Sequence, residues 1–307
     1  MEQVSFDILI ATKNRITDLT RTLSSLTELM NKPNVRFVVY DDGSTDGTAK
    51  LIRSNFPKVS VLRSEISKGY MFCRNTMLNQ STADYAISLD DDAHFISENP
   101  LEEIQFCFEN NPKCGLIAFR IFWGLENPIN VISYEENERV NGFVGCGHVW
   151  RMTAWKSIPS YPEWFQFYGE EDFSACHLFK ENWQIQYVPS VLVHHRVNVS
   201  QRKKHTDYRS RLRRSIRARW YLYFLFYPWN KIPRKLLYTL WIQVKFKTLK
   251  GDGKATLAII QALFDVLINF PKLLRQSKRF SKEEFIQFEQ LSEAKIFWIP
   301  RKQSTLK

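Results

Sequence analysis

The sequence lacks the motifs by which several large classes of protein are identified. It contains neither G-x-G-x-x-G nor G-x-x-x-x-G-K-[ST], so neither a Rossmann dinucleotide site nor a P-loop is expected. Its five cysteines are scattered and form no C-x-x-C pair. This pattern predicts reduced thiols in a cytosolic compartment rather than a zinc site or a disulfide framework.

Long uncharged apolar segments are also missing. The first residues show no basic region followed by an apolar run, so we expect no signal peptide. Residues 220–229 are apolar but too short to cross a bilayer, and residues 255–274 include Asp265 and Asn269. The sequence therefore predicts no transmembrane helix.

The chain contains enough apolar side chains for a sizeable core. Its charges are distributed unevenly between its two parts. Of its 307 residues 44% are hydrophobic and 14% aromatic. Residues 1–200 hold 18 Lys/Arg and 25 Asp/Glu, a net charge of −7. Residues 201–307 hold 25 Lys/Arg and 7 Asp/Glu, a net charge of +18. This asymmetry predicts two parts with different partners, with a boundary near residue 200.

A buried strand that ends in three adjacent carboxylates is the most informative segment. Residues 85–89 are apolar enough for a core strand, and Asp90, Asp91 and Asp92 follow directly. Three adjacent like charges repel one another unless a cation offsets them, and Mg²⁺ and Mn²⁺ prefer oxygen ligands. Since alternate side chains of a strand share a face, Asp90 and Asp92 are predicted to point the same way. A solvated acidic turn is the alternative.

Segments of strand and helix character alternate through the first half of the chain. Predicted strands cover residues 4–11, 36–40, 59–62 and 85–89, and predicted helices cover residues 16–30, 48–55 and 69–79. Such alternation with short links predicts an α/β fold with a doubly wound, mostly parallel sheet flanked by helices.

Polar side chains follow three of these strands. They are Thr12 and Arg15, then Asp41 and Asp42, then Asp90 and Asp92. In an open α/β sheet the carboxyl ends of parallel strands meet at one edge, where ligands bind. The sequence therefore predicts a nucleotide site there, with metal and cationic side chains as the phosphate partners.

These segments, taken in order and spacing, resemble family 2 glycosyltransferases with the GT-A nucleotide-sugar domain. The segments that carry the resemblance are Ile8 to Arg15, Val39 to Thr48, Arg74-Asn75 and Leu89 to Asp92. The likeness covers roughly residues 4–200 and is closest to bacterial enzymes of surface-polysaccharide synthesis.

The resemblance implies roles for individual residues on the donor side. Asp41 would hydrogen-bond the nucleotide base, and Thr12 and Arg15 would line the same pocket. Arg74 would lie near the base or the pyrophosphate. Asp90 would reach the ribose or a metal-bound water, and it is also a candidate metal ligand. Asp92 would bind Mn²⁺ or Mg²⁺ directly.

On the acceptor side, the resemblance implies a general base in the segment Glu170-Glu171-Asp172. This segment precedes a helical run, where acidic residues also suit the helix dipole without any catalytic role. The family pattern favours Asp172 as the base, with Glu171 as the second candidate because one extra acid makes the register ambiguous.

A strand predicted over residues 184–195 ends in two histidines, and the resemblance implies that one of them completes the metal or pyrophosphate site. The two side chains point to opposite faces of a strand, and His194 is the one favoured. His148, in the glycine-interrupted segment 143–151, is interpreted as a structural residue. Residues 126–139 are predicted to be a mobile loop over the acceptor cleft, or else a plain surface loop.

Beyond Arg196 the chain becomes basic and aromatic. Nine Lys/Arg lie between residues 202 and 219, the almost wholly apolar residues 220–229 follow, and helices are expected over 236–246 and 257–274. Contact with a membrane surface through residues 202–229 is the favoured interpretation. Packing inside the protein is the alternative, and nucleic-acid binding is disfavoured because the N-terminal half is acidic.

The sequence thus predicts an inverting, metal-dependent glycosyltransferase, cytoplasmic and peripheral to the inner face of the cell membrane. It would transfer a hexose or deoxyhexose from a UDP-, dTDP- or GDP-linked donor to a glycan or lipid-linked acceptor. A nucleotidyltransferase is a weaker candidate because the turn after the first strand has no glycine. A catalytically silent sugar-nucleotide-binding or membrane scaffold protein is the alternative from another class.

Overall fold

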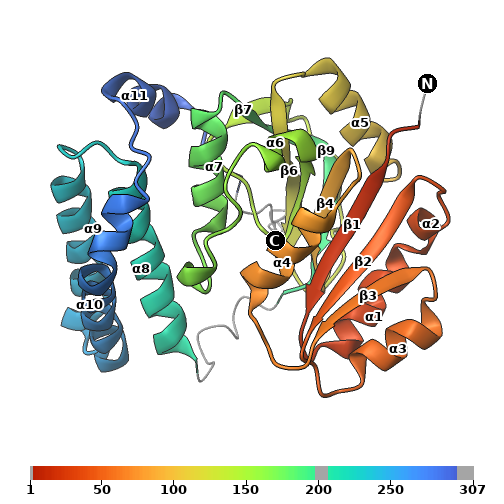
Figure 1. The fold of residues 1–307 in the computed structure, drawn as a ribbon, viewed down its shortest axis with the longest axis horizontal. Coiled ribbons are helices and arrows are strands. Elements are labelled where there is room, and N and C mark those ends of the chain that lie inside the picture. The colour runs from red at the N-terminus through yellow and green to blue at the C-terminus, as the bar shows by residue number, and fades with distance from the viewer. Residues whose placement is uncertain (1–2, 198–206, 296–307) are drawn as a thin grey trace, which may run out of the picture.

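The structure, a computed structural model, describes residues 3–197 and 207–295 as a mixed α/β protein (Figure 1). The strands are β1 (Phe6–Thr12), β2 (Val35–Asp42), β3 (Val59–Ser64), β4 (Tyr85–Asp90), β5 (Ala93–Phe95), β6 (Cys114–Trp123), β7 (Glu138–Val140), β8 (Gly147–Arg151) and β9 (Gln184–His195). The α-helices up to β9 are α1 (Ile16–Ser25), α2 (Thr27–Met30), α3 (Thr48–Asn55), α4 (Tyr70–Gln80), α5 (Pro100–Asn110), α6 (Met152–Lys156) and α7 (Glu170–Lys180). The α-helices after it are α8 (Tyr208–Phe226), α9 (Ile232–Phe246), α10 (Gly253–Arg275) and α11 (Lys282–Gln290).

All nine strands belong to one sheet, whose order is β3-β2-β1-β4-β8-β6-β9-β5, with β7 paired to β9. The four strands from β3 to β4 are parallel, as the alternation of strand and helix predicts. Strand β8 enters between β4 and β6 in the antiparallel sense. Opposite strand directions therefore meet beside β4, the strand that ends in the three aspartates.

Each face of the sheet is buried under its own set of helices, because successive side chains of a strand point to opposite faces. In β1, Ile8 and Ile10 pack with side chains of α1, α2 and α5. Leu9 packs on the other face, where α4, α6, α7 and α8 contribute to the core. Helices on both faces of the sheet fit the predicted doubly wound architecture.

The aromatic segment after Arg219 is internal rather than membrane-facing. In α8 the apolar side chains of Trp220, Tyr221, Leu222, Tyr223, Leu225 and Phe226 are buried. A helix that is apolar on all sides is normally buried. Burial of these six side chains supports the packing alternative for them, and membrane contact through the rest of residues 202–229 stays a prediction. Residues 202–206 lie outside the described residues.

Helix α10 is long and apolar enough, by length and composition alone, to be considered for a membrane span. The sequence predicts no membrane span here, because the segment includes Asp265 and Asn269. In the structure Asp265 is buried and paired with Arg213 and Arg217 of α8. The boundary predicted near residue 200 stays a prediction, although buried side chains of α8 and α10 belong to the same core cluster as one face of the sheet.

Candidate active site

The register of the parallel strands brings the predicted site residues to one edge of the sheet. Thr12 at the end of β1 lies opposite Asp41 of β2. Ala11 of the same strand lies opposite Asp90 at the end of β4. Three segments more than 25 residues apart in sequence thus end side by side, as expected for a ligand site of an α/β sheet.

Asp90, Asp92 and His195 form a compact cluster at this edge. One ligand atom of each lies within 4.8 Å of the others. His195 Nε2 is 3.0 Å from Asp92 Oδ1 and 3.8 Å from Asp90 Oδ2. Apart from the imidazole, the buried Asp92 Oδ1 has no hydrogen-bond partner. Two carboxylates and an imidazole suit Mn²⁺ or Mg²⁺, so these residues fit a divalent cation.

The histidine of this cluster corrects one prediction from the sequence. His194, the favoured ligand, points to the opposite face, where its Nε2 lies 2.8 Å from the carbonyl oxygen of Gly124. Its ring packs against His94 and Phe122. The expectation that only one of the two histidines faces the cleft is correct, but the residue is His195.

Asp91 lies outside the cluster, in the turn that follows β4 and also carries Asp92. It accepts a hydrogen bond of 2.8 Å from Thr12 Oγ1 and lies 3.2 Å from Arg15 Nε. Burial raises the pKa of Asp91 to about 7, although Arg15 opposes the shift. The hydroxyl of Thr12 is thus used inside the protein, where it holds the turn that carries the metal-site carboxylates.

Arg15 and His195 offset the negative charge of Asp92. Arg15 Nη2 lies 2.6 Å from Asp92 Oδ2. Burial favours the protonated acid, but the hydrogen bonds and charges of His195 and Arg15 outweigh it and lower the pKa of Asp92 to about 2. Because an imidazole must be neutral to bind a metal, a cation at this cluster would displace the proton from His195.

Arg74 connects the carboxylates with the glycine-rich segment that precedes β8. Its guanidinium is almost fully buried and donates to Asp90 Oδ1 at 2.7 Å and to the carbonyl oxygen of Gly145 at 2.8 Å. The ring of Tyr70 lies 4.5 Å from the same guanidinium. Arg74 therefore fixes Asp90 and the backbone of Gly145 relative to each other.

Asp41 lies at the base of the site with both oxygens in use. Its Oδ1 accepts from the backbone of Ser44 at 2.8 Å, and its Oδ2 lies 2.7 Å from Arg63. Asp42 accepts hydrogen bonds from the backbone of Lys68 at 2.6 Å and of Gly69 at 3.0 Å. Contact between Asp41 and a nucleotide base stays a prediction.

The three acidic residues at the start of α7 have different surroundings. Glu171 lies against Gly145, where an added Cβ would be only 2.6 Å from Glu171 Oε1. The Glu171 carboxylate thus occupies the space that a side chain at position 145 would fill. Burial raises the pKa of Asp172, and the positive charge of Arg219 on α8 acts in the opposite direction.

Glu170, to which the sequence pattern assigns no individual role, also belongs to this group of acids. It is buried, and its Oε2 has no hydrogen-bond partner. Burial raises the pKa of Glu170 to about 7, although the charge of Arg74 acts in the opposite direction. Burial also raises the pKa of Glu171, which the negative charges of Glu170 and Asp172 raise further.

The aromatic segment before α7 and His148 are largely structural. Phe165 is fully buried, and Trp164 packs against Tyr221 of α8. The ring of Phe167 lies 5.6 Å from that of Tyr70, which in turn lies over the guanidinium of Arg74. His148 is fully buried and lies 3.3 Å from the hydroxyl of Tyr161, in keeping with its interpretation as a structural residue.

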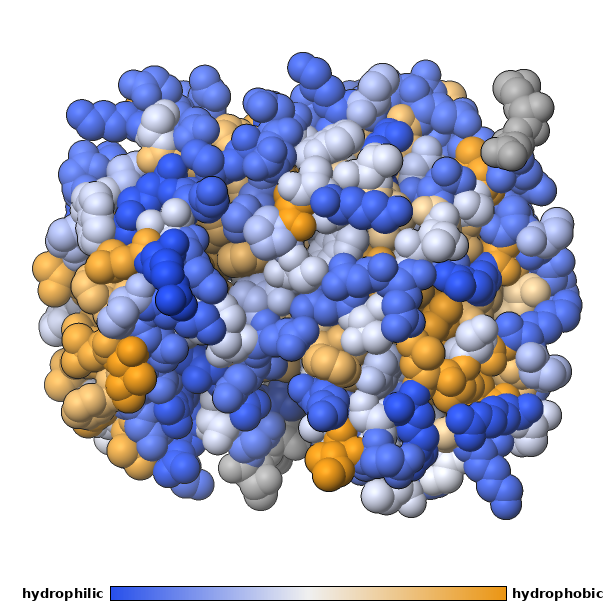
Figure 2. Space-filling view, viewed as in Figure 1, coloured by the Kyte–Doolittle hydropathy of each residue, from blue (hydrophilic) through white to orange (hydrophobic). Residues whose placement is uncertain are grey.

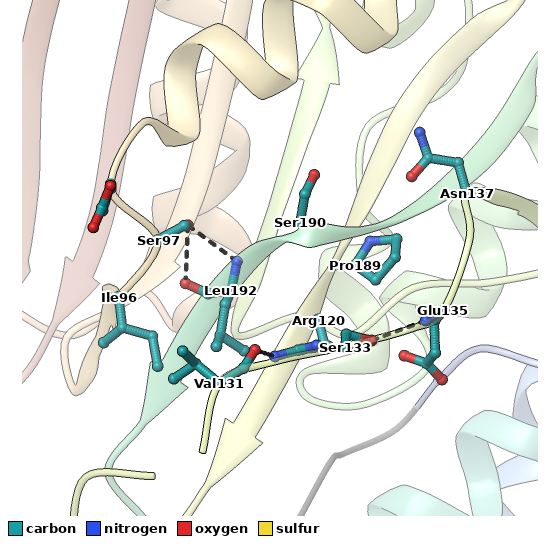
Figure 3. A pocket seen from close by; sticks show the side chains of 11 residues that line it. Ile96, Ser97, Arg120, Val131, Ser133, Glu135, Asn137, Pro189, Ser190 and Leu192 are labelled. Carbon is teal, nitrogen blue, oxygen red and sulfur yellow. Dashed lines mark hydrogen bonds between the residues drawn. The ribbon is translucent and has the colours of Figure 1, made fainter. Parts of the chain in front are cut away.

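A pocket of about 400 Å³ lies beside the loop predicted to cover the acceptor (Figure 3). Its walls are residues 96–98 after β5, residues 189–192 of β9 and the segment from Val131 to Asn137. Arg120 of β6 donates a hydrogen bond to the carbonyl oxygen of Val131 and so holds this segment on the sheet. The cluster of Asp90, Asp92 and His195 does not line this pocket, and the acceptor role of the loop stays a prediction.

Comparisons with known proteins agree with this geometry. Residues 7–154 match the family model described as glycosyl transferase family 2. A protein of Haemophilus influenzae described as an uncharacterized glycosyltransferase is 30% identical over 110 residues, which is 36% of each chain. The match therefore spans about a third of that relative's length.

Solved structures share the fold at low sequence identity. The mannosyltransferase PcManGT of Pyrobaculum calidifontis, in complex with GDP-Man and Mn²⁺, has a TM-score of 0.55 and 14% identity, with 94% of this chain and 84% of that chain covered. S. aureus TarS 1-349, in complex with UDP-GlcNAc, has a TM-score of 0.57 and 15% identity, with 89% and 84% covered. GalNAc-T7 with UDP, GalNAc and Mn²⁺ has a TM-score of 0.60 and 11% identity, with 88% and 57% covered. The sheet and its flanking helices are thus those of the GT-A fold.

Proposed function

Because this chain belongs, through residues 7–154, to glycosyltransferase family 2, we propose that it transfers a sugar from a nucleoside-diphosphate sugar to a hydroxyl group of a glycan or lipid-linked acceptor. The observation that carries the proposal is the cluster of Asp90, Asp92 and His195 at the edge of the sheet. The likeness to structures that hold GDP-Man or UDP-GlcNAc supports a nucleotide-sugar donor.

The donor's diphosphate would lie between the acidic cluster and the basic side chains that surround it. A divalent cation bound by Asp90, Asp92 and His195 would supply electrostatic stabilisation of the charge that develops on the departing nucleoside diphosphate. Arg15 is half exposed beside this cluster, where it contacts Asp92 Oδ2 and the neighbouring Asp91 Oδ1. Arg74 holds Asp90 in place from behind.

The acceptor hydroxyl would attack the anomeric carbon while the bond from that carbon to the phosphate oxygen breaks. The proton of the hydroxyl passes to a carboxylate at the start of α7. Glu171 is our first choice, because it lies against Gly145, whose carbonyl oxygen is bound by the same arginine that holds Asp90. Asp172 is the second choice. A single displacement without a covalent intermediate inverts the configuration at the anomeric carbon.

The site of action follows from the proposed acceptor. A lipid-linked acceptor of surface-polysaccharide synthesis would be met at the inner face of the cell membrane. We therefore propose a cytoplasmic enzyme that is peripheral to this membrane. The strongly positive charge of residues 201–307 supports this placement, since the inner leaflet carries anionic lipids.

A thermal-shift panel tests the donor site first. UDP, GDP, dTDP and their sugars are each added with and without Mn²⁺ or Mg²⁺. A ligand present at about 100 times its Kd stabilises the native state by about 2.7 kcal/mol, which raises the Tm by about 5 °C. We expect one nucleotide to give this shift only with metal.

Asp92→Asn is expected to abolish this shift without loss of the fold, because it removes one charge from the cluster at nearly constant shape. Glu109→Gln, which changes an exposed carboxylate of α5 in the same way, is the matched control and should keep the shift. Absence of any shift in folded protein would contradict the transferase proposal. A shift without release of nucleoside diphosphate in the presence of acceptors would favour a silent sugar-nucleotide-binding protein.

A further inference from the structure

Helices α9 and α10 expose a broad apolar face that the catalytic site does not use. Its members, which we call the α9–α10 face, are Leu237, Tyr238, Trp241, Phe246 and Leu249 from α9 and the turn after it, and Leu257, Ile260, Phe264, Leu267, Ile268 and Leu274 from α10. Each of these side chains is between 39% and 75% exposed. In Figure 2 hydrophobic residues gather at the left edge, over α9 and α10. Monomeric soluble proteins rarely expose large contiguous apolar patches, so this face calls for a partner.

The inner side of α10 is fixed to α8 by polar contacts. Asp265 lies 2.5 Å from Arg213 and 3.5 Å from Arg217. Tyr221 donates to the backbone oxygen of Asp265 at 3.1 Å and accepts from Asn269 at 2.9 Å. Asp265 and Asn269 of this apolar helix therefore face the protein, and the most exposed residues along its middle, from Leu257 to Ile268, are apolar.

Both ends of α10 also stay on the body of the protein. At the start, Tyr208 of α8 donates to Asp252 at 3.0 Å. At the far end, the backbone nitrogens of Lys278 and Phe280 donate to Leu225 and Phe226, each at 2.8 Å. A membrane-spanning α10 would have to break these contacts and leave Arg217 buried without its carboxylate. The helix is thus suited to lie in the plane of a membrane rather than to cross it.

The charges around the face have one dominant sign. Residues 231–278 contain ten Lys/Arg and two Asp/Glu. Both acids, Asp252 and Asp265, are used within the protein. Arg234, Lys245, Lys250, Lys254 and Arg275 are exposed and lie at the ends of the two apolar stripes. The ammonium groups of Lys245 and Lys250 each lie 5.5 Å from the ring of Phe246.

We propose that the α9–α10 face docks on an anionic lipid surface, with its apolar side chains in the interfacial region and its cations at the headgroups. Apolar and aromatic side chains bordered by Lys and Arg are the pattern of an in-plane membrane helix. A second copy of the chain fits less well, because a two-fold interface would bring the same cations together. The docking surface thus differs from the segment 202–229 that the sequence pattern favours.

This inference rests on the proposed function, because a lipid-linked acceptor would be met at a membrane. Its test does not depend on catalysis. Vesicle binding is measured without any donor sugar, and donor binding is measured without vesicles. Failure of one proposal can therefore be told apart from failure of the other.

The experiment is flotation of the full chain with vesicles of phosphatidylcholine alone or mixed with phosphatidylglycerol. Binding is expected to the mixed vesicles and to weaken as salt increases. Phe264→Glu should reduce the bound fraction at least about tenfold, since it replaces a large inserted apolar side chain by a charge. Phe106→Glu is the matched control, because Phe106 is 65% exposed on α5 and should not contribute.

Further variants separate charge from apolar contact. Lys245→Glu combined with Lys250→Glu should abolish the preference for anionic vesicles, because each cation near the surface contributes about fivefold to binding. Circular dichroism and an unchanged nucleotide-induced thermal shift show that each variant is folded.

Three results would overturn the proposal. One is equal binding of wild type and Phe264→Glu. Another is self-association of the wild type, measured by sedimentation velocity without vesicles, that Phe264→Glu abolishes while vesicle binding is absent. The last is resistance of bound protein to extraction with alkaline carbonate, which would indicate a helix that spans the bilayer.

Discussion

At the scale of single residues, substitutions can test which acid of α7 acts as the general base. One residue along a helix corresponds to a rotation of about 100°. Adjacent acids therefore meet different surroundings, with Glu171 against Gly145 and Asp172 toward Arg219. The family pattern could not settle the register, because the chain has one acid more than the pattern requires.

Replacement of each acid by its amide tests this division. Glu171→Gln is expected to lower kcat by about 10²–10⁴-fold, the usual contribution of a general base, and to leave the nucleotide-induced thermal shift intact. Asp172→Asn should lower kcat less than about tenfold if its role is to face Arg219. Initial rates of nucleoside-diphosphate release at saturating donor measure both effects. The reverse order of the two losses would identify Asp172 as the base.

The histidine ligand shows why single residues at a strand end are hard to assign from sequence. The pairing of β6 with β9 shifts between Phe119 and Arg120, whose partners are Val188 and Leu192. Such an irregularity interrupts the strict alternation of side chains. Counting along the strand could therefore show that His194 and His195 face opposite ways, but not which of them faces Asp92.

At the scale of helices and strands, most of the N-terminal half could be predicted. Apolar segments bounded by turn residues mark β1 to β4 and the helices between them, and parallel pairing then brings the strand ends together. Of the C-terminal helices, α8 and α11 were not predicted, and α9 and α10 could be located from the sequence but not oriented. Their buried side depends on the pair between Asp265 and the arginines of α8, which are some 50 residues apart in sequence.

This pair is expected to hold α10 on α8. Asp265→Ala should lower the free energy of unfolding by about 3 kcal/mol, because it leaves the charge of Arg217 buried without a partner. Urea denaturation measures the change. The exposed pair of Lys235 and Glu289 is the control, and Glu289→Ala should cost less than about 1 kcal/mol.

A compensating variant separates charge from packing. Asp265→Leu together with Arg213→Leu and Arg217→Leu removes all three charges and should recover most of the loss. Equal instability of the triple variant and Asp265→Ala would mean that side-chain packing, rather than the unpaired charge, causes the effect.

At the scale of the whole molecule, buried neutral histidines link stability to pH. His177 of α7 packs against Phe173 and Phe226, and Lys278 and Lys180 are nearby charges. Burial lowers its pKa from 6.5 to about 4. Between these values the unfolded chain binds a proton that the folded chain does not, so the free energy of unfolding falls as the pH falls from 6.5 toward 4.

Replacing His177 should remove its contribution to the pH dependence of the free energy of unfolding. For a single histidine with these pKa values the loss between pH 7 and pH 5 is about 2 kcal/mol. The free energy of unfolding of His177→Leu is therefore expected to fall by about 2 kcal/mol less than that of wild type between pH 7 and pH 5. Paired urea titrations measure the difference. Parallel losses in the two proteins would show that His177 does not contribute. His94, whose pKa burial also lowers to about 4, stays in both proteins and leaves part of the slope.

Arg15 gives the acidic cluster a counter-ion that belongs to the chain itself. A metal ion that binds alone would have to compete with this guanidinium for Asp92, so its binding free energy would be small. A metal ion that arrives with a diphosphate offers Arg15 a new anionic partner, so the competition ends. Metal and donor are therefore expected to bind cooperatively, each weak without the other, and the empty enzyme would not retain a cation between turnovers.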